Sequence, residues 1–381
     1  MAQTASKLTT WQGACIITGY GVGSGIMALP YLVSQAGTVA SLLLLVAAFF
    51  FSYCMHMMLA EIALGAGDGA QVVTMFRTFL FRGKAGKVVI PVLFVLVVLV
   101  LVFNLAAYVA GGADIIASFG VPPLAAKIAF YVVAAAVVFF GLKVLGISES
   151  VSVSIIIAMV ALLAVASLFH LDNSILHPTA SGAAVLAFFG MAMFAFVAFF
   201  SVPQVVKGLQ GDAPRIRRAI VIGLGLNLIF ILVITGCSLA ASKEVTELAM
   251  IGWSAGIGTW AQIVGSLFTV LALLTTYWSL SLALSDIINE QTKLNFKLCW
   301  LIATLPSLLL VLFDLGGFLD LMRTAGGLIA ILIACLVVPA LRRCRAETDA
   351  RLLGSALAST PMQVLVVLAF LLMAVGSTIS I

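Results

Sequence analysis

The stretch GYGVGSGIMALP, residues 19–30, decides the fold, because it places four glycines within seven positions of an otherwise apolar run. Each glycine in a helix costs about 0.8–1 kcal/mol relative to alanine, so four of them remove about 3–4 kcal/mol of helix preference. Close helix packing through GxxxG spacing is the alternative interpretation. Glycine at every second position spreads over more than one helix face, however, which a single packing contact does not require. We therefore expect the helix to break between Gly19 and Gly25.

The rest of the chain is too apolar for a water-soluble protein. Of its 381 residues, 64% are hydrophobic and 9% are charged, whereas soluble domains carry about 25% charged residues. Since a membrane-crossing helix needs about 20 largely apolar residues, we expect an all-α polytopic membrane protein with one transmembrane domain over residues 1–381. The apolar runs predict 11 transmembrane helices, at residues 12–34, 38–64, 88–111, 124–146, 151–170, 183–203, 219–241, 255–285, 298–313, 317–340 and 361–380.

The distribution of basic residues predicts the orientation. With the N-terminus in the cytoplasm, all Lys and Arg residues except Lys127, Lys243 and Arg323 fall on the cytoplasmic side, which is 16 of the 19 in the chain. Positive residues resist translocation, so we expect an integral protein of a plasma or inner membrane with a cytoplasmic N-terminus. The odd number of crossings then places the C-terminus outside.

The sixth predicted crossing has features that correspond to the first. It reads AVLAFFGMAMFAFVAFFSVPQ, with Gly190 near its middle and Pro203 close to its end. Crossings one and six lie five apart and run in opposite directions, and paired interrupted helices in two inverted halves point to the binding site of a transporter. We expect an inverted five-plus-five repeat with discontinuous helices one and six. Its halves cover residues 12–170 and 183–340, and one extra C-terminal helix covers residues 361–380.

Four short motifs carry a resemblance to a known family. They are GSGIMALPY in the first crossing, FAF in the sixth, PQVVKGLQGDAPRIRRAI in the following loop and LTTYW in the eighth. Their order and membrane placement resemble the amino acid/auxin permease family, which belongs to the amino acid, polyamine and organocation superfamily and has the leucine-transporter-like fold. The resemblance in layout covers roughly residues 11–340. One departure follows FAF, where many members carry a polar residue and this chain reads VAFF, residues 197–200.

The break in the first crossing predicts where a substrate binds. A half-helix that begins there offers free N–H groups and the positive end of its dipole, which together favour a carboxylate. We expect Gly23, Ser24 and Gly25 to bind the substrate carboxylate. In the sixth crossing Phe194 and Phe196 flank the expected break and are candidates to receive an apolar side chain, although packing is the other interpretation of these rings.

A cation site is predicted on the other side of the same break. The carbonyls of Gly19 and Val22 point the opposite way from the N–H groups and are suited to a cation. If the resemblance carries over, the hydroxyls of Thr275 and Thr276 in the eighth crossing complete that site. The alternative is ordinary hydrogen bonding of these hydroxyls to the preceding helical turn.

Other polar residues within the apolar runs are weaker candidates. Asn104 and Tyr108 lie four apart and share a helix face, so we expect them to point at the cavity or at another helix. Ionisable residues inside a bilayer are costly and indicate function, which makes His56 and Glu61 candidates for a proton relay against a structural or interfacial role.

A further ionisable pair marks the outer end of the tenth crossing. Asp320 and Arg323 are candidates for an outer gate, with a solvated ion pair as the alternative.

The absence of a deep carboxylate or arginine in these predicted crossings favours a neutral amino acid, aliphatic or aromatic, as the substrate. We expect a secondary active transporter that works by alternating access and couples to a cation. Sodium is slightly favoured over the proton, because the fifth crossing has no lysine to replace a cation as in some proton-coupled relatives. A passive channel or facilitator for small polar solutes is the alternative function.

Other kinds of activity have no support in these motifs. Neither converging metal ligands nor a nucleophile with its base is recognisable, so an enzyme is not expected. The expected partners are the substrate and the lipid bilayer, with no nucleic acid and no cofactor or metal other than a coupling Na⁺.

Overall fold

The computed structural model describes residues 7–67, 69–171, 174–179, 181–314 and 318–379, except for the side chains of Ser24, of residues 318–330 and of Ile333. Within this described part the elements are helices, and no strand occurs. The elements are α1 (Thr10–Gly21), α2 (Ser24–Ala36), α3 (Thr38–Ala66), α4 (Val72–Phe79), α5 (Gly83–Ser118), α6 (Pro123–Phe139), α7 (Leu142–Ser167), α8 (Gly182–Ala195), η1 (Phe199–Ser201), α9 (Val202–Gly208), α10 (Ala213–Ala241), α11 (Ala249–Ile257), α12 (Thr259–Thr292), α13 (Phe296–Leu312), α14 (Phe318–Glu347) and α15 (Thr360–Gly376).

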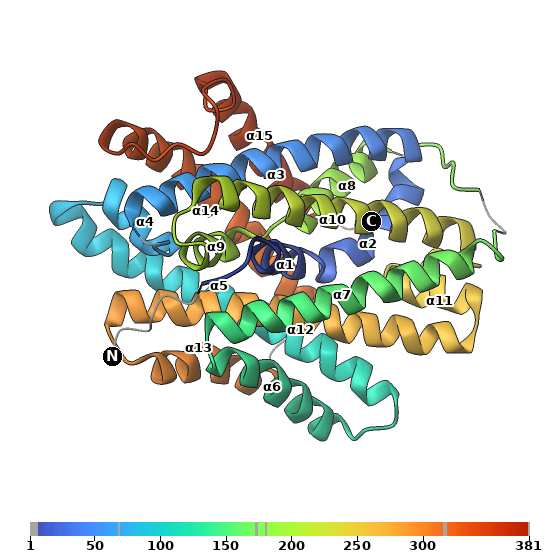
Figure 1. The fold of residues 1–381 in the computed structure, drawn as a ribbon. Helices are drawn as coiled ribbons and strands as arrows, with labels where there is room; N and C mark the ends of the chain where they lie inside the picture. Colours follow the sequence, from blue (N-terminus) through green and yellow to red (C-terminus); the bar gives the residue numbers. More distant parts are fainter. Residues whose placement is uncertain (1–6, 68, 172–173, 180, 315–317, 380–381) are drawn as a thin grey trace.

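The long helices run mostly along one axis of the molecule. In Figure 1 the N-terminus and α4 lie toward one end of this axis, and α11 lies toward the other. Six helical segments of the described chain are long and apolar enough to cross a membrane: α3, α5, α7, α8 through α9, α10 and α12. The bent pair α1 and α2 adds a seventh, and α6, α13 and α15 are apolar but shorter. The number of 11 crossings stays a prediction.

Local sequence explains where several helices begin. Thr9 caps α1, because its hydroxyl accepts a hydrogen bond from the Gln12 N–H while the Gln12 side chain accepts one from the Thr9 N–H. Asp212 caps α10 by accepting a hydrogen bond from an N–H of the first turn. Gly37 between α2 and α3 has φ +87°, and Gly141 between α6 and α7 has φ +81°. These left-handed conformations favour glycine and separate consecutive helices.

The first crossing is interrupted, as its glycines predict. α1 and α2 meet at a bend of 55°, and Gly23 is the N-cap of α2. The break is shorter than predicted, because Gly19 and Gly21 still belong to α1 and Gly25 already belongs to α2. All four glycines are buried. The irregular backbone is therefore covered by protein, which is the condition for its survival at membrane depth.

The sixth crossing is interrupted nearer its end than its middle. α8 ends at Ala195, the chain is irregular at residues 196–198, and η1 and α9 follow. Gly190 is not part of the break. A methyl group added to Gly190 would lie 2.7 Å from the carbonyl carbon of Gly376, so this glycine allows α8 and α15 to approach closely.

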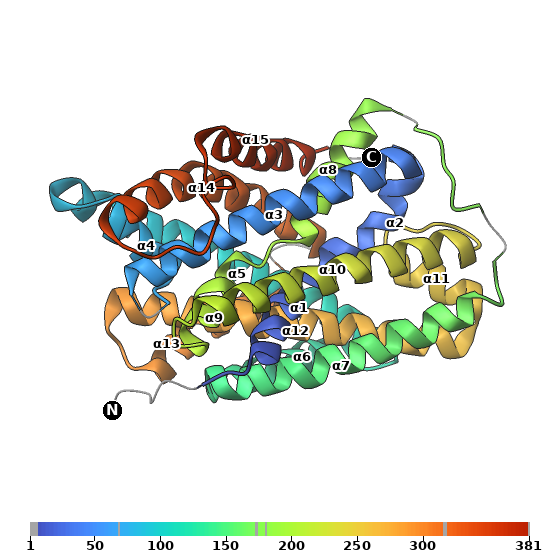
Figure 2. The same ribbon diagram turned by 45° about the horizontal axis from the view of Figure 1, so that its top comes forward.

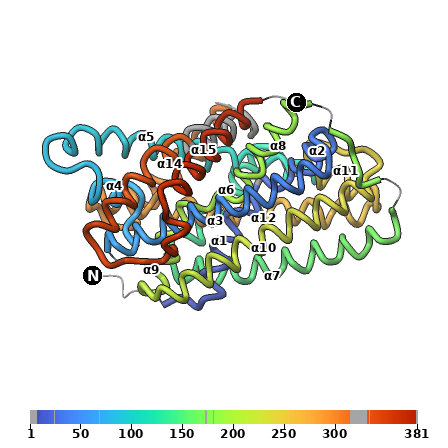
Figure 3. Tube along the Cα trace, turned by 90° about the horizontal axis from the view of Figure 1, so that it is seen from above, coloured from blue at the N-terminus to red at the C-terminus, as the bar shows by residue number. Residues whose placement is uncertain are grey.

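The packing of the helices follows the predicted inverted repeat. One group consists of α5, α6, α12 and α13, which contact one another, and a second consists of α1 with α2, α3, α8 with α9, and α10. Each group combines two neighbouring crossings of the first half with the corresponding two of the second half. Figure 2 shows α3 of the second group, which contacts both α8 and α10. The extra helix α15 packs on α8 and α14, on the opposite flank from α7 (Figure 3).

Two predicted boundaries differ from the structure. Residues 147–150 were expected to lie between the fourth and fifth crossings, but α6 ends at Phe139 and α7 begins at Leu142. These residues belong to the first turns of α7, where Glu149 is buried and Ile147 is exposed. The eighth crossing, predicted at residues 255–285, merges the end of α11 with α12, which are separated by Gly258 with φ +143°.

Candidate functional site

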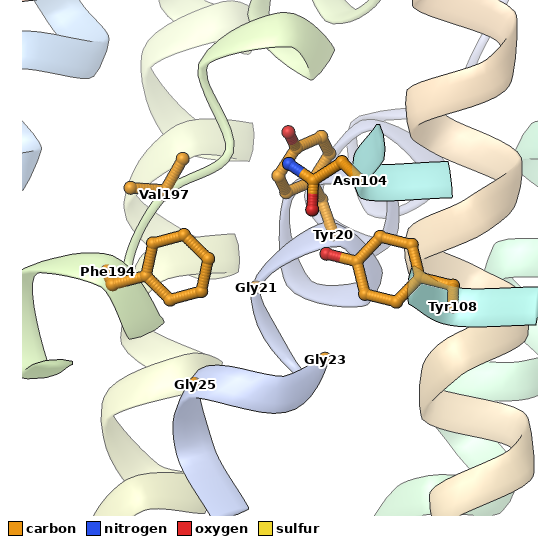
Figure 4. A pocket seen from close by; sticks show the side chains of 8 residues that line it. All are labelled: Tyr20, Gly21, Gly23, Gly25, Asn104, Tyr108, Phe194 and Val197. Atoms are coloured by element: carbon orange, nitrogen blue, oxygen red, sulfur yellow. The ribbon is translucent and has the colours of Figure 1, made fainter. Parts of the chain in front are cut away.

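A small cavity lies where the two broken crossings face α5. The cavity encloses about 10 Å³, which is room for about one water molecule. An amino acid needs far more space, so the site is closed in this conformation and access requires the surrounding helices to move. The lining residues, drawn in Figure 4, are Tyr20, Gly21, Gly23, Gly25, Asn104, Tyr108, Phe194 and Val197.

Five residues predicted for the substrate lie together at this cavity: Gly23, Gly25, Asn104, Tyr108 and Phe194. In Figure 4 the rings of Tyr108 and Phe194 stand on opposite sides of the glycine segment. The Oδ1 atom of Asn104 is buried and has no hydrogen-bond partner among the described residues. It is therefore an acceptor that a ligand can use.

Three lining residues escaped the sequence analysis: Tyr20, Gly21 and Val197. Tyr20 and Gly21 lie within the glycine-rich stretch, and this position is the feature of the sequence from which they could have been predicted to line the cavity. Val197 lies in the irregular segment after α8. Tyr20 and Val197 make the cavity more aromatic and apolar than the predicted residues alone.

The backbone at the break suits an anion. Gly23 precedes α2 and Gly25 lies in its first turn, and both border the cavity. The first N–H groups of a helix have no partner within it, and they carry the positive end of the helix dipole. Free N–H groups thus meet the cavity at the place predicted for a carboxylate. Ser24 lies between these glycines, and its side chain is outside the described part of the chain.

Phe196 lies away from the cavity lining. It follows the end of α8 and is fully buried, with its ring centroid 5.7 Å from that of Phe49 at an interplanar angle of 73°. The FAF motif therefore contributes one ring, Phe194, to the cavity and one to the helix packing. The difference arises because the helix ends between the two rings.

The residues predicted for a cation are brought together by α1 and α12. The hydroxyls of Thr275 and Thr276 each lie 3.1 Å from the carbonyl oxygen of Gly19. They also lie 2.9 and 3.0 Å from the carbonyl oxygen of Ala272 in their own helix. The back-bonding interpretation of these threonines is therefore confirmed, and their part in a cation site stays a prediction. Val22 is buried, and its N–H donates to the preceding turn of α1.

The glycines of the break also permit close packing. A methyl group on Gly21 would lie 2.0 Å from Nδ2 of Asn227 in α10, and one on Gly25 would lie 2.9 Å from Cα of Ala195. The Asn227 amide is buried and its Nδ2 and Oδ1 atoms have no partner in the described part of the molecule. The glycines therefore provide both a break and the contacts that hold α8 and α10 against it.

Glu149 is a residue that the sequence analysis missed. It lies in α7 with 0% exposure, on the buried face that also carries Leu145, Ser152 and Ile156. Its Oε1 atom accepts a hydrogen bond of 2.8 Å from the Ser279 hydroxyl of α12. The signal for it was the spacing of these residues by three and four positions, which is typical of one helix face.

His56, predicted as part of a proton relay, holds the break of the sixth crossing in place. Its Nδ1 lies 2.7 Å from the carbonyl oxygen of Ser52, so this nitrogen donates, and its Nε2 accepts a hydrogen bond of 3.2 Å from the Ala198 N–H. The ring also packs at 4.9 Å from Phe199. Both nitrogens of a neutral imidazole are used in this arrangement. A relay role for His56 stays a prediction.

Replacing His56 with alanine is expected to lower the free energy of unfolding by about 1–3 kcal/mol, because the Ala198 N–H loses its acceptor inside the protein. Thermal unfolding of the purified protein in detergent measures this loss. The matched control is His170→Ala, where a half-buried histidine at the end of α7 contacts the Ala166 carbonyl. We expect the control to change stability by less than about 0.5 kcal/mol. Equal effects of the two substitutions would contradict the anchoring role.

Glu61, the other relay candidate, is buried in an ion pair. Its carboxylate accepts hydrogen bonds from Arg345 at 2.5 and 2.9 Å and from the N–H groups of Leu352 and Leu353 at 2.9 and 3.0 Å. These contacts tie the segment after α14 to α3. The arrangement supports the structural interpretation of Glu61, and its relay role stays a prediction.

The outer gate predicted from the sequence falls on side chains outside the described part of the chain. The side chains of Asp320 and Arg323 are outside the described residues. Among the residues that are described, no group of three or more His, Cys, Asp or Glu side chains is placed to hold a metal ion.

Comparisons with known proteins find a family of permeases. The model of the tryptophan/tyrosine permease family matches residues 6–377. This is a different family from the amino acid/auxin permeases that the motifs suggested. Tyrosine-specific transport system 1 of Haemophilus influenzae is 23% identical over 348 residues, which are 85% of each chain.

Solved transporter structures share the fold. MhsT in complex with L-phenylalanine has a TM-score of 0.68 at 16% identity, over 97% of this chain and 99% of that one. MHP1, a nucleobase-cation-symport-1 family transporter in a closed conformation with bromovinylhydantoin, has a TM-score of 0.66 at 14% identity, over 98% and 92%. The manganese transporter of Eremococcus coleocola has a TM-score of 0.63 at 15% identity, over 96% and 85%. These matches confirm the predicted all-α transporter fold of the leucine-transporter-like type.

Proposed function

The chain belongs to the tryptophan/tyrosine permease family, and on that basis we propose that it is a secondary active transporter that carries aromatic amino acids across a membrane together with a cation. It is a permease and not an enzyme. Its relative in Haemophilus influenzae is named as a tyrosine-specific transport system. Among the neutral amino acids that the sequence predicts as substrates, this relationship favours aromatic ones over aliphatic ones.

One observation supports the aromatic substrate most strongly. The free N–H groups at the start of α2 and the rings of Tyr20, Tyr108 and Phe194 border the same cavity. An amino acid carboxylate pairs with the N–H groups, and an aromatic side chain gains from stacking or edge contacts with neighbouring rings. The apolar side chain of Val197, which follows FAF and lines the cavity, also fits an apolar substrate.

The transport cycle follows from the closed cavity. Because a cavity of about 10 Å³ holds no amino acid, α1 with α2 and α8 with α9 must move relative to α5 to admit one. Breaks in two oppositely directed crossings allow the half-helices to tilt separately, which is the mechanical basis of alternating access. We place the N-terminus in the cytoplasm of a cell with the protein in its plasma or inner membrane, from the distribution of basic residues.

Uptake into proteoliposomes tests this function. Vesicles that contain the purified protein are expected to accumulate radiolabelled tyrosine, tryptophan or phenylalanine above the external concentration when a proton or sodium gradient is directed inward. Unlabelled aromatic amino acids should compete, and leucine, lysine and glutamate should compete weakly. Protein-free vesicles and vesicles treated with an ionophore are the controls.

The same measurement decides between the transporter and the passive channel. A channel equilibrates its solute and cannot concentrate it. Uptake that stops at the external concentration under every gradient would contradict coupled transport. Absence of any aromatic amino acid flux would contradict the proposed substrate.

A further inference from the structure

A carboxylate lies against the broken helix at the place predicted for a cation. Glu149 of α7 faces Gly19 of α1 so closely that a methyl group on Gly19 would be 2.0 Å from the Glu149 Oε2 atom and 3.1 Å from Cβ of Thr275. Oε1 accepts a hydrogen bond from Ser279, whereas Oε2 has no hydrogen-bond partner among the described residues. α7, α1 and α12 thus enclose one free carboxylate oxygen beside the backbone of α1.

Within the described part of the chain, no basic side chain pairs with Glu149. The acidic partners in the four ion pairs there are Glu347, Asp314, Asp286 and Glu61. An ionised carboxylate without a partner is costly in a water-free interior. Glu149 therefore needs a proton or a metal cation to neutralise it in this conformation.

The charged groups on the neighbouring helices have partners elsewhere or are exposed, and a thiol also lies near Glu149. That thiol is Cys15 of α1, which is buried and interacts electrostatically with Glu149. On the other helices that pack against α7, Lys127 of α6 pairs with Asp314 and Lys207 of α9 with Asp286 of α12. Arg215 and Arg217 of α10 donate to the Leu8 and Leu352 carbonyls, Glu290 of α12 accepts from the Gln71 N–H, and Arg218 of α10 is exposed.

The oxygen atoms around Glu149 favour a proton over sodium. A sodium ion would need several oxygen ligands, but the hydroxyls of Thr275 and Thr276 are directed at the Gly19 and Ala272 carbonyls. These contacts occupy both lone pairs of the Gly19 carbonyl oxygen, which is therefore not free to bind a metal. A proton needs one free lone pair, which Oε2 provides. The sequence-based preference for sodium rested on the lack of a lysine in a fifth crossing placed at residues 151–170, a range that excludes Glu149.

We propose that Glu149 carries the coupling proton of this transporter, an inference that rests on the proposed function. The proton enters from one side of the membrane, forms an O–H bond on Glu149, and leaves to the other side as that bond breaks. Only the Glu149 carboxyl group changes its protonation state. Each cycle that carries an amino acid moves one positive charge across the membrane.

The position of Glu149 links its charge to the motion of α1. Gly19 lies in the last turn of α1, where the helix dipole is negative and carbonyl groups point outward. A protonated Glu149 packs against this end without repulsion. After the proton leaves, the negative carboxylate repels the end of α1, which favours its movement away from α7. Substrate release and proton release then follow from the same movement.

The test uses wild-type protein and Glu149→Gln in proteoliposomes, with radiolabelled tyrosine as substrate and a pH-sensitive dye inside the vesicles. In the wild type, an inward pH gradient is expected to drive tyrosine accumulation, and tyrosine is expected to drive proton influx. In Glu149→Gln we expect both to fall at least tenfold, while exchange of internal for external tyrosine continues. Asp286→Asn is the matched control, because it removes a buried carboxylate that lies on a different helix, α12, and should retain accumulation driven by the pH gradient.

A second variant covers the case in which Glu149→Gln does not fold. The Ser279 hydroxyl donates to Oε1 and thereby favours the ionised form of Glu149. Ser279→Ala removes this donor and therefore favours the protonated form. It should shift the pH of half-maximal uptake upward and retain tyrosine exchange. A purely structural carboxyl would leave that pH unchanged, and this result would overturn the proposal.

The remaining outcomes separate this proposal from the proposed function. Accumulation driven by a pH gradient in Glu149→Gln would overturn the role of Glu149 and leave aromatic amino acid transport intact. Accumulation in the wild type under a sodium gradient alone would likewise overturn the role of Glu149 as the proton carrier and leave aromatic amino acid transport intact. If the wild type neither accumulates nor exchanges tyrosine, tryptophan or phenylalanine, the proposed function itself fails.

Discussion

Replacing Gly25 with valine is expected to lower aromatic amino acid uptake about 100-fold, because displacing a binding group by on the order of 1 Å can cost that much. A methyl group on Gly25 would lie 2.9 Å from Cα and 3.1 Å from N of Ala195. Both are backbone atoms, so no rotation of a side chain relieves the contact. The start of α2 and the end of α8 must separate, which moves the free N–H groups away from Phe194.

Gly236→Val is the matched control for this experiment. Gly236 lies inside α10, and an added methyl group there would meet no atom within 4 Å. We expect this variant to transport at a rate close to that of the wild type. Tyrosine uptake and thermal unfolding should be measured on both proteins, so that a loss of folding is distinguished from a loss of binding. Wild-type uptake by Gly25→Val would show that the contact between the two broken crossings is not needed for transport.

Replacing Arg345 with methionine is expected to lower the free energy of unfolding by about 3–5 kcal/mol, because it leaves a buried carboxylate without its counter-charge. Glu61 has a side-chain exposure of 0%, and the Arg345 guanidinium is its one ion-pair partner in the described part of the protein. Methionine preserves much of the length of the side chain and isolates the effect of charge. The shift of the thermal unfolding midpoint in detergent measures the loss.

A surface ion pair with the same chemistry is the control. Arg82 pairs with Glu347, and their side chains are 51% and 39% exposed. Exposed ion pairs contribute about 0–1 kcal/mol, so Arg82→Met should have a small effect. The double variant Glu61→Gln with Arg345→Met should recover much of the stability, because it removes both charges from the interior and keeps a side-chain oxygen that accepts from the Leu352 and Leu353 N–H groups. A double variant as unstable as Arg345→Met alone would show that the ion pair is not the source of the loss.

The fold was predictable from the sequence because the bilayer limits the choices. Hydrophobic runs of the required length can cross a membrane only as helices, and four glycines in seven positions weaken one of these helices whatever its neighbours are. The same argument located the first break to within a few residues. In the sixth crossing the single interior glycine was a weaker signal, since Gly190 serves the contact with Gly376 of α15.

The residues of the cavity were predictable only in part. Asn104 and Tyr108 share a helix face, and that face lines the cavity together with Phe194. Phe196 lies two positions further and packs against Phe49, because α8 ends between the two rings. The exact residue at which a helix ends is among the least certain features of a sequence, and here it decides which ring faces the substrate.

Sequence alone determined that this chain is a helical membrane protein with a weakened first crossing, because hydrophobic length and helix preference are local properties of the residues. Only the tertiary structure decided which polar groups meet. Glu149 looked like part of a polar connection, yet the end of α6 at Phe139 brings it into α7 and against Gly19, far away in the sequence. Contacts between distant segments depend on the exact start and rotation of each helix. A shift of one residue turns a side chain by about 100° around its helix.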